Sequence, residues 1–229
     1  MRALSKARLG LGTIFGRTAK NIAGRLGFRA RLLALLVLAV PALATADVRT
    51  LVFFGDSLTA GLGVDPDQAY PALIQRKIDA AHLAWRVVNA GLSGDTTAGG
   101  LRRLEWVLRQ PMDLIVVELG ANDGLRGLKP EVTRANLQLI IDRIRTLRPG
   151  TRIVLAGMQL PTNLGADYTG KFAAIYPDLA KRNDLPLIPF LLEGVGGHPE
   201  LNQGDGMHPT PAGHERVADN VWKVLAPLL

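Results

Sequence analysis

The 229-residue sequence is long enough for one domain with a leader, and its 48% hydrophobic content suffices for a packed core. The formal net charge of +7 comes from residues 1–46, which hold eight of the 27 basic residues and no acidic one; 19 basic and 20 acidic residues follow. The part after the leader therefore lacks the positive excess that nucleic-acid-binding proteins carry. The sequence has no cysteine, so no disulfide can form.

The leader has the three parts of a secretory signal peptide. Basic residues come first, an apolar run follows over 32–40, and a proline with small residues then allows cleavage after Ala44 or Ala46. We therefore expect 1–46 to be a signal peptide or basic leader, 47–229 to be the folded domain, and the protein to be periplasmic or secreted. The alternative is an uncleaved anchor, although nine apolar residues fall short of the roughly 20 that span a bilayer.

From residue 47 onward, short apolar runs alternate with amphipathic segments, as is typical of a parallel sheet with helices on both faces. No repeat, linker or change of composition interrupts this part, so we expect one domain. The apolar runs predict five strands, at 49–54, 86–89, 114–119, 152–157 and 187–190. The amphipathic segments predict five helices, three of which carry a proline in the first turn, at 66–81, 98–109, 130–147, 167–182 and 211–225.

A Gly-Asp-Ser sequence follows the first predicted strand, at residues 55–57. Open α/β sheets bind ligands in the crevice beyond the carboxyl ends of their strands, so Ser57 is placed as a candidate nucleophile. Gly55 allows the chain to turn sharply there, because it has no Cβ atom. The alternative is a turn that only ends the strand, since Gly, Asp and Ser are common turn residues.

Residues that could bind a ligand or take part in a reaction also follow the second and third predicted strands. After the second, Gly94 frees the backbone to present N–H groups to a ligand, and one of the residues 95–97 could cap the next helix. After the third, the amide of Asn122 can donate a hydrogen bond to a developing negative oxygen. Both segments could equally be turns without a ligand. Glu118 ends an apolar run, and we expect it to have a structural partner rather than a catalytic role.

An Asp-Gly-Met-His sequence precedes the last predicted helix, at 205–208. The spacing lets the Asp205 carboxylate reach one imidazole nitrogen of His208 and leaves the other free, which orients a general base. The alternative is an Asp-Gly turn followed by an exposed histidine. A metal site built from these two residues with His198 and His214 is imaginable, but the tight ligand spacings of zinc sites are absent, and we expect no metal and no cofactor.

Apolar residues near these segments predict an acyl pocket. Leu58, Leu62, Leu92 and Leu125 lie close in sequence to the polar residues, and a turn-rich loop with Pro161 follows the fourth strand. If they line the crevice, they favour lipid-like esters or thioesters, and we take Leu58, Leu125 and Pro161 as the substrate-binding residues. The alternatives are ordinary core positions for the leucines and a plain surface connection for the loop.

Four separated segments together resemble the sequence blocks of the GDSL, or SGNH, hydrolases. They occur in the order of that family: Gly55-Asp56-Ser57-Leu58, Ser93-Gly94-Asp95, Gly120-Ala121-Asn122-Asp123 and Asp205-Gly206-Met207-His208. The resemblance covers nearly everything from Val48 onward. Further stretches look like the bacterial periplasmic multifunctional esterases with acyl-CoA thioesterase, lysophospholipase, protease and arylesterase activities. The leader is longer than that family leads us to expect, and the loop after the fourth strand differs in detail.

The resemblance implies a flavodoxin-like three-layer α/β/α fold with a five-stranded parallel sheet. It makes Ser57 the nucleophile, Asp205 and His208 the other members of a triad, and the Ser57 N–H, the Gly94 N–H and the Asn122 amide the oxyanion donors. The implied function is hydrolysis of acyl esters or thioesters of small molecules by a serine hydrolase, through an acyl-enzyme. We expect no nucleic-acid partner, and we take a monomer as the default. Transient contact with a membrane surface would fit a lipid substrate.

Two other functions stay open at this point. A non-catalytic module could hold an acyl chain or an anion in the same crevice. A flavodoxin-like nucleotide binder would share the order of layers, but the glycine-rich phosphate-binding signature is missing after the first strand, where Gly61 and Gly63 stand alone.

Overall fold

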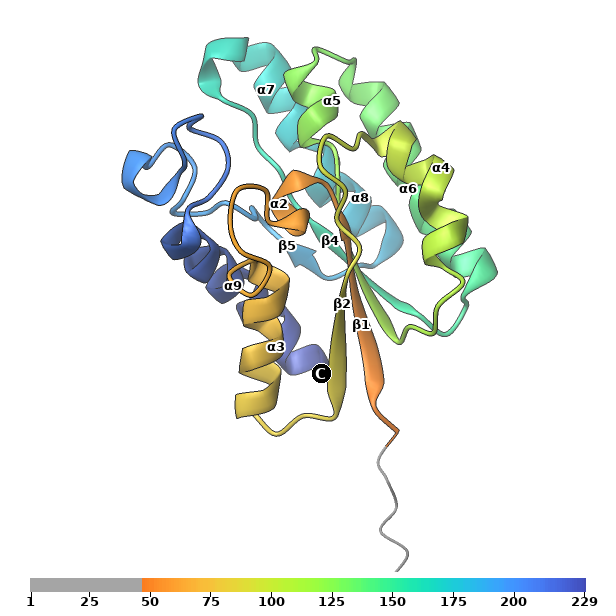
Figure 1. The fold of residues 1–229 in the computed structure, drawn as a ribbon. Helices are drawn as coiled ribbons and strands as arrows, with labels where there is room; N and C mark the ends of the chain where they lie inside the picture. Colours follow the sequence, from red (N-terminus) through yellow and green to blue (C-terminus); the bar gives the residue numbers. More distant parts are fainter. Residues whose placement is uncertain (1–46) are drawn as a thin grey trace, which may run out of the picture. The chain divides into compact units, whose positions relative to one another are not determined.

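The computed structural model describes residues 47–229, which contain a five-stranded parallel sheet in the order β2-β1-β3-β4-β5 (Figure 1). All five predicted strands are confirmed, although the fifth ends two residues earlier than predicted because Pro189 has no N–H to donate to the sheet. The predicted leader lies outside the described residues. The strands are β1 (Arg49–Gly55), β2 (Trp85–Asn89), β3 (Leu114–Glu118), β4 (Arg152–Ala156) and β5 (Leu187–Ile188).

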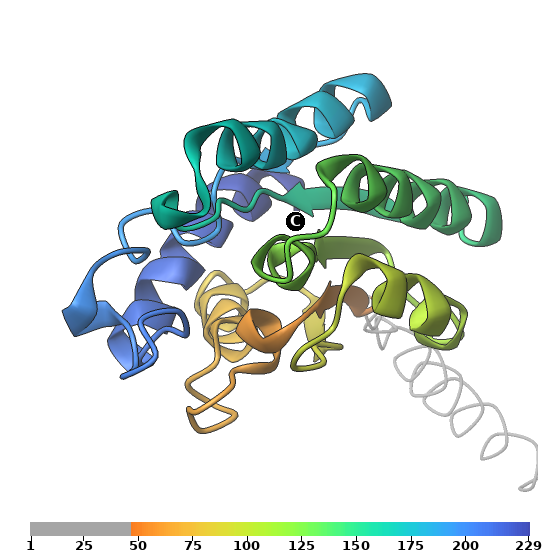
Figure 2. The same ribbon diagram turned by 90° about the horizontal axis from the view of Figure 1, so that it is seen from above.

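Helices cover both faces of the sheet, which gives the three layers that the resemblance implied (Figure 2). On one face α3 (Tyr70–Ala80) packs against α9 (Pro211–Leu225). On the other face α6 (Pro130–Leu147) contacts both α4 (Thr97–Val107) and α8 (Ile175–Asn183). The shorter helical segments are α2 (Ser57–Ala60), α5 (Ala121–Leu125), η2 (Thr162–Leu164), α7 (Ala166–Ala173), η3 (Pro199–Leu201) and η4 (Ala226–Leu228).

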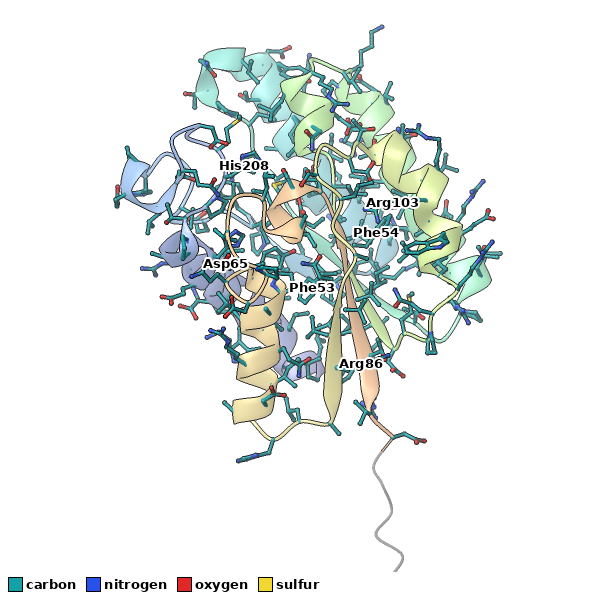
Figure 3. All side chains as sticks on the ribbon, in the orientation of Figure 1. Phe53, Phe54, Asp65, Arg86, Arg103 and His208 are labelled. Carbon is teal, nitrogen blue, oxygen red and sulfur yellow. The ribbon has the colours of Figure 1, made fainter. Side chains whose placement is uncertain are left out.

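The central strands β1 and β3 are buried along almost their whole length, as a parallel sheet covered on both faces requires. Successive β1 side chains point to opposite layers (Figure 3). Phe53 packs edge-on against Tyr70 of α3, with ring centroids 5.2 Å apart. Phe54 lies beneath the Arg103 guanidinium of α4, 4.3 Å from its central carbon. The apolar run therefore fixes β1 between both helical layers.

Two of the predicted helices differ from the observed ones. The helix predicted at 66–81 begins only at Tyr70. The helix predicted at 167–182 is broken into α7 and α8 at Ala174. Pro177 explains the break, because it has no N–H for the carbonyl four residues earlier and its ring crowds that carbonyl. The other three predicted helices are confirmed, with ends that agree within two residues.

The connections between strands reverse direction next to β1. The chain runs from β1 to β2 on one side and then returns to β3 on the other side. Doubly wound sheets bind ligands at such a reversal, beyond the carboxyl ends of the strands. Ser57 follows β1 and Asn122 follows β3, so the fold places both at this point.

Candidate active site

The hydroxyl, imidazole and carboxylate that were predicted to work together lie in one hydrogen-bonded row. Ser57 Oγ is 2.8 Å from His208 Nε2, and His208 Nδ1 is 2.5 Å from Asp205 Oδ2. The serine follows β1, whereas the other two residues come from the loop before α9. This loop brings His208 near the carboxyl ends of the strands (Figure 3). This is the geometry of a nucleophile, a base and a group that orients the base.

The Asp205 carboxylate is held by the loop that carries it. Its Oδ1 atom accepts hydrogen bonds from the backbone N–H of Met207, at 2.9 Å, and from that of His208, at 3.0 Å. The backbone hydrogen bond from His208 is the main cause that lowers the pKa of Asp205 to about 2, and the imidazole hydrogen bond adds to it. The carboxylate is therefore ionised at neutral pH and can stabilise a protonated imidazole.

Ser57 begins α2, a single helical turn that is too short to be stable alone. The Asp56 carboxylate caps this turn by accepting a hydrogen bond from the Leu58 N–H, at 3.0 Å. Glycine is required before it, because a Cβ atom on Gly55 would lie 2.2 Å from Thr59 Oγ1. The candidate nucleophile is thus held by the residues on either side of it.

Two carboxyl groups are buried beneath this turn, those of Asp56 and Glu118. Burial raises the pKa of Asp56 to about 6, although hydrogen bonds from Leu58 and Asn122 act against it. Burial also raises the pKa of Glu118 well above its ordinary value, and the charge of Asp56 adds to the shift. Glu118 accepts hydrogen bonds from the Asp56 N–H and from the Thr59 hydroxyl, which confirms the prediction that it has structural partners.

The other two predicted oxyanion donors line one cavity together with the serine. Gly94 has a φ of 78°, which favours glycine, and its carbonyl accepts a hydrogen bond from Arg126 Nη2 at 3.0 Å. The Asn122 amide nitrogen donates to Asp56 Oδ2 at 3.1 Å and to the Asp95 carbonyl at 3.0 Å. Because both partners are acceptors, the nitrogen and not the oxygen of the amide must face them.

Arg103 was not among the predicted site residues, yet it joins two parts of the site. Its Nε atom is 2.6 Å from Asp95 Oδ2, and its Nη atoms donate to the carbonyls of Ala90, at 2.8 Å, and Gly55, at 2.9 Å. The guanidinium therefore ties the loop after β2 to the end of β1. The sequence carries no clear signal for this role, because the partners of Arg103 are brought to it only by the packing of α4 against the sheet.

A cavity of about 600 Å³ opens beside Ser57 and His208. The three predicted substrate-binding residues, Leu58, Leu125 and Pro161, all line it. The expectation for Leu92 is wrong: this side chain is absent from the cavity lining and is 52% exposed. The backbone of Leu92 is used to anchor its loop to Gly55 and Asp95, which leaves the side chain facing solvent.

Residues 53–216, which include every predicted catalytic and oxyanion residue, match the model of the GDSL-like lipase/acylhydrolase family. The chain belongs to this family. It is 43% identical over 185 residues to esterase TesA of Pseudomonas aeruginosa, covering 80% of this chain and 91% of that protein. It is 41% identical over 195 residues to thioesterase 1/protease 1/lysophospholipase L1 of Escherichia coli, covering 85% and 90%. A crystal structure of TesA gives a TM-score of 0.76 at 43% identity, covering 79% of this chain and 100% of the other.

Membership of the GDSL-like family confirms the predicted family, fold class and hydrolase class. It leaves the nucleotide binder without support, whereas the roles of individual residues stay predictions. In the part of the chain that the structure describes, no three His, Cys, Asp or Glu side chains group as metal ligands. His198 and His214 therefore do not join Asp205 and His208 in a group of metal ligands, and His198 instead lies 3.4 Å from Glu200.

Proposed function

We propose that the protein is a serine hydrolase that cleaves acyl esters or thioesters of small molecules through an acyl-enzyme. The observation that carries the proposal is the 2.8 Å contact between Ser57 Oγ and His208 Nε2 in the lining of an apolar cavity. A hydroxyl paired with a base whose other nitrogen is bound to a carboxylate is the arrangement that activates a serine. The similarity to an esterase and to a thioesterase/lysophospholipase supports the same reaction.

In the first half of the reaction, His208 Nε2 takes the proton of Ser57 Oγ as this oxygen attacks the carbonyl carbon of the substrate. Asp205 stabilises the imidazolium that forms. His208 then gives its proton to the leaving alcohol or thiol, the bond between this group and the carbonyl carbon breaks, and the acyl group stays on Ser57. In the second half, water attacks in the same way and releases the carboxylic acid and the free serine.

Three donors stabilise the oxyanion in this proposal: the N–H groups of Ser57 and Gly94 and the side-chain amide of Asn122. The Asp56 carboxylate and the Asp95 carbonyl fix the direction of that amide before any substrate binds. The oxyanion then shares one of the amide N–H groups with these acceptors. Donors that are already fixed need no reorganisation when negative charge develops on the carbonyl oxygen.

The apolar wall of the cavity favours acyl chains of lipid-like esters or thioesters, with Leu58, Leu125 and Pro161 in contact with the substrate. We further propose that the protein works in the periplasm or after secretion, because the sequence of 1–46 has the pattern of a signal peptide. We take a monomer as its default assembly. Among the helices of residues 47–229, none has the length and apolar character needed to cross a membrane.

Hydrolysis of p-nitrophenyl acyl esters of increasing chain length tests the proposal. The wild-type protein should hydrolyse these esters. Ser57→Ala should lower kcat by about 10⁴-fold or more while the circular dichroism spectrum is unchanged. Ser93→Ala is the matched control, because Ser93 is an exposed serine close to the same cavity, and it should keep wild-type activity. A wild-type protein that binds acyl esters without hydrolysing them would instead support the non-catalytic binding module.

A further inference from the structure

Glu118 is a carboxyl group buried beneath the turn that carries Ser57. It is the last residue of β3 and pairs with Gly55, the last residue of β1, in the register of the sheet. Its side chain has no exposed surface. Glutamate is almost never fully buried unless it has partners, so its contacts indicate what it does.

The Oε2 atom of Glu118 contacts the nucleophile turn on both sides of the serine. It accepts a hydrogen bond from the Asp56 N–H at 3.2 Å and another from the Thr59 hydroxyl at 2.7 Å. Thr59 Oγ1 is in turn 2.6 Å from the hydroxyl of Tyr70 in α3. One oxygen atom therefore connects the residue before Ser57 and a residue after it to the central strand β3.

The turn depends on such contacts because α2 has only four residues, fewer than a helix needs to be stable alone. The reaction depends on them because a nucleophile that is misplaced by about 1 Å reacts roughly 10²-fold more slowly. Glu118 is absent from the lining of the cavity, so it reaches the substrate only through the turn.

The surroundings of Glu118 favour an uncharged carboxyl group. Within residues 47–229, no Lys, Arg or His side chain lies at ion-pair distance from it. The ionisable groups that face it are Asp56, Tyr70 and Tyr176, none of which carries a positive charge. Its Oε1 atom is buried without a hydrogen-bond partner among the described residues, a position in which an ionised oxygen would be strongly unfavourable. Burial and the Asp56 charge raise the pKa of Glu118 accordingly.

We propose that Glu118 is a positioning residue for the nucleophile, and that its uncharged carboxyl group clamps the turn on both sides of Ser57 through a single oxygen atom. This role rests on the proposed serine mechanism. It differs from an electrostatic role, in which a Glu118 carboxylate would stabilise the protonated His208 during the reaction. Glutamine separates the two roles, since it keeps an accepting oxygen and never carries a charge.

Two substitutions of Glu118 measure the clamp in the full-length enzyme. Glu118→Gln should keep kcat within about threefold of the wild-type value, because the accepting oxygen is retained. Glu118→Met keeps the length of the side chain but leaves the Asp56 N–H and the Thr59 hydroxyl unpaired, so kcat should fall roughly 10²-fold. The KM should change less than about twofold in both variants, because the cavity lining is intact.

Thr59→Val keeps the test decisive if Glu118→Met does not fold. It removes one of the two donors to Oε2 with little change of shape, and kcat should fall roughly tenfold. Thr151→Val is the matched control, since it removes the hydrogen bond from Thr151 Oγ1 to the Met112 carbonyl at the amino end of β4, and it should keep wild-type kcat.

Three results would overturn the clamp: wild-type kcat in Glu118→Met, an equal loss in Glu118→Gln and Glu118→Met, or equal kcat in Thr59→Val and Thr151→Val. The second of these results would point to a charged Glu118. A failure of the serine mechanism is distinguishable, because the wild-type enzyme would then show no turnover that depends on Ser57.

Discussion

The two halves of the candidate site are built in opposite ways. The buried half, named for the side chains beneath it, contains Ser57, Gly94 and Asn122 and is held by Asp56, by Glu118 of β3 and by Arg103 of α4. Ser57 itself is only 7% exposed, although Gly94 is exposed. The loop half, with Asp205 and His208, is held mainly by backbone groups a few residues away, and the Asp205 side chain is 40% exposed. The core therefore fixes the candidate nucleophile and the candidate oxyanion donors, whereas the candidate base is oriented by its own loop. Changes in the buried half should lower stability and activity together, and changes in the loop half should lower activity alone.

The largest expected effect lies in the loop half. Asp205→Asn should lower kcat by about 10⁴-fold, because an amide neither stabilises the imidazolium nor selects the required tautomer of His208. The free energy of unfolding at pH 7 should change by less than about 1 kcal/mol, since the carboxylate is partly exposed. Ester hydrolysis and urea unfolding on one preparation measure both quantities. A loss of stability as large as that expected for a core residue would contradict the claim that changes in the loop half lower activity alone.

Arg103→Met should have the next largest effect, on stability in the buried half. The Arg103 and Asp95 side chains are only 18% and 6% exposed, and breaking such a pair by removing one partner costs about 3–5 kcal/mol of unfolding free energy. The kcat should fall as well, because the loop that Arg103 holds carries Gly94.

Arg143→Met is the matched control for that substitution. Arg143 pairs with Glu105 on the surface, where the two side chains are 48% and 65% exposed, and its loss should cost less than about 1 kcal/mol. Urea unfolding of both variants checks the difference. Equal costs would show that the Arg103 contacts do not stabilise the buried half.

Asn122→Ala should affect activity and stability together, though each less than the changes above. Loss of one oxyanion donor lowers kcat by about 10²–10³-fold. The free energy of unfolding should also fall by about 1–2 kcal/mol, because the Asp56 carboxylate and the Asp95 carbonyl each lose a hydrogen bond. Kinetics and thermal unfolding measure the two effects. An Asn122→Ala enzyme with unchanged stability would show that the amide is not fixed by the core.

The last predicted effect is a dependence of stability on pH that arises from His214 of α9. This side chain is buried, and its Nδ1 atom accepts a hydrogen bond from the Tyr70 N–H at 3.3 Å. Burial, followed by the charge of His208, lowers the pKa of His214 to about 4 in the folded state, whereas the unfolded chain titrates near 6.5. As the pH falls from about 6.5 towards 4, the unfolded state binds a proton at His214 that the folded state does not bind, so stability is lost. Between pH 7 and pH 5 the loss that His214 alone contributes should be about 2 kcal/mol.

His214→Gln isolates this contribution. Asp56 and Glu118 act in the opposite sense, because burial raises the folded pKa of Asp56 from 3.8 to about 6 and that of Glu118 well above its ordinary value, so their protonation adds stability as the pH falls. The difference between wild type and variant removes both contributions from the comparison. Urea unfolding at pH 7 and pH 5 should show a change of stability that is about 2 kcal/mol less unfavourable in His214→Gln than in the wild type. His82→Asn, a change at an exposed histidine with φ 54°, should reproduce the wild-type dependence; a wild-type dependence in His214→Gln would contradict the prediction.

Sequence patterns predicted the ends of a helix well where the amphipathic pattern continued without a break. The helices at 130–147 and 211–225 agree to the residue, because each begins with a proline in its first turn and continues without a break. The break at Ala174 was not predicted, since the apolar spacing continues across it and Pro177 lies in the first turn of α8, where proline is tolerated. The convergence of Ser57 with Asn122 was predictable because parallel strands end at one edge of the sheet.

The support beneath the site was not predictable in the same way. Arg103 binds carbonyls that are 13 and 48 positions away, and Glu118 binds groups 59 and 62 positions away. Only the register of β1 against β3 and the packing of α4 bring these groups together. Neither periodicity nor a short motif contains that information, so the sequence predicts the residues that face the substrate better than the residues that hold them.

Covalent labelling of the purified protein with a fluorophosphonate tests the central claim most directly, because this reagent reacts with a serine only when a base activates it. We expect a single label per chain on the peptide that contains Ser57, no label in Ser57→Ala, and much slower labelling in His208→Ala. An unlabelled wild-type protein, or a label on Ser93 in place of Ser57, would contradict the account.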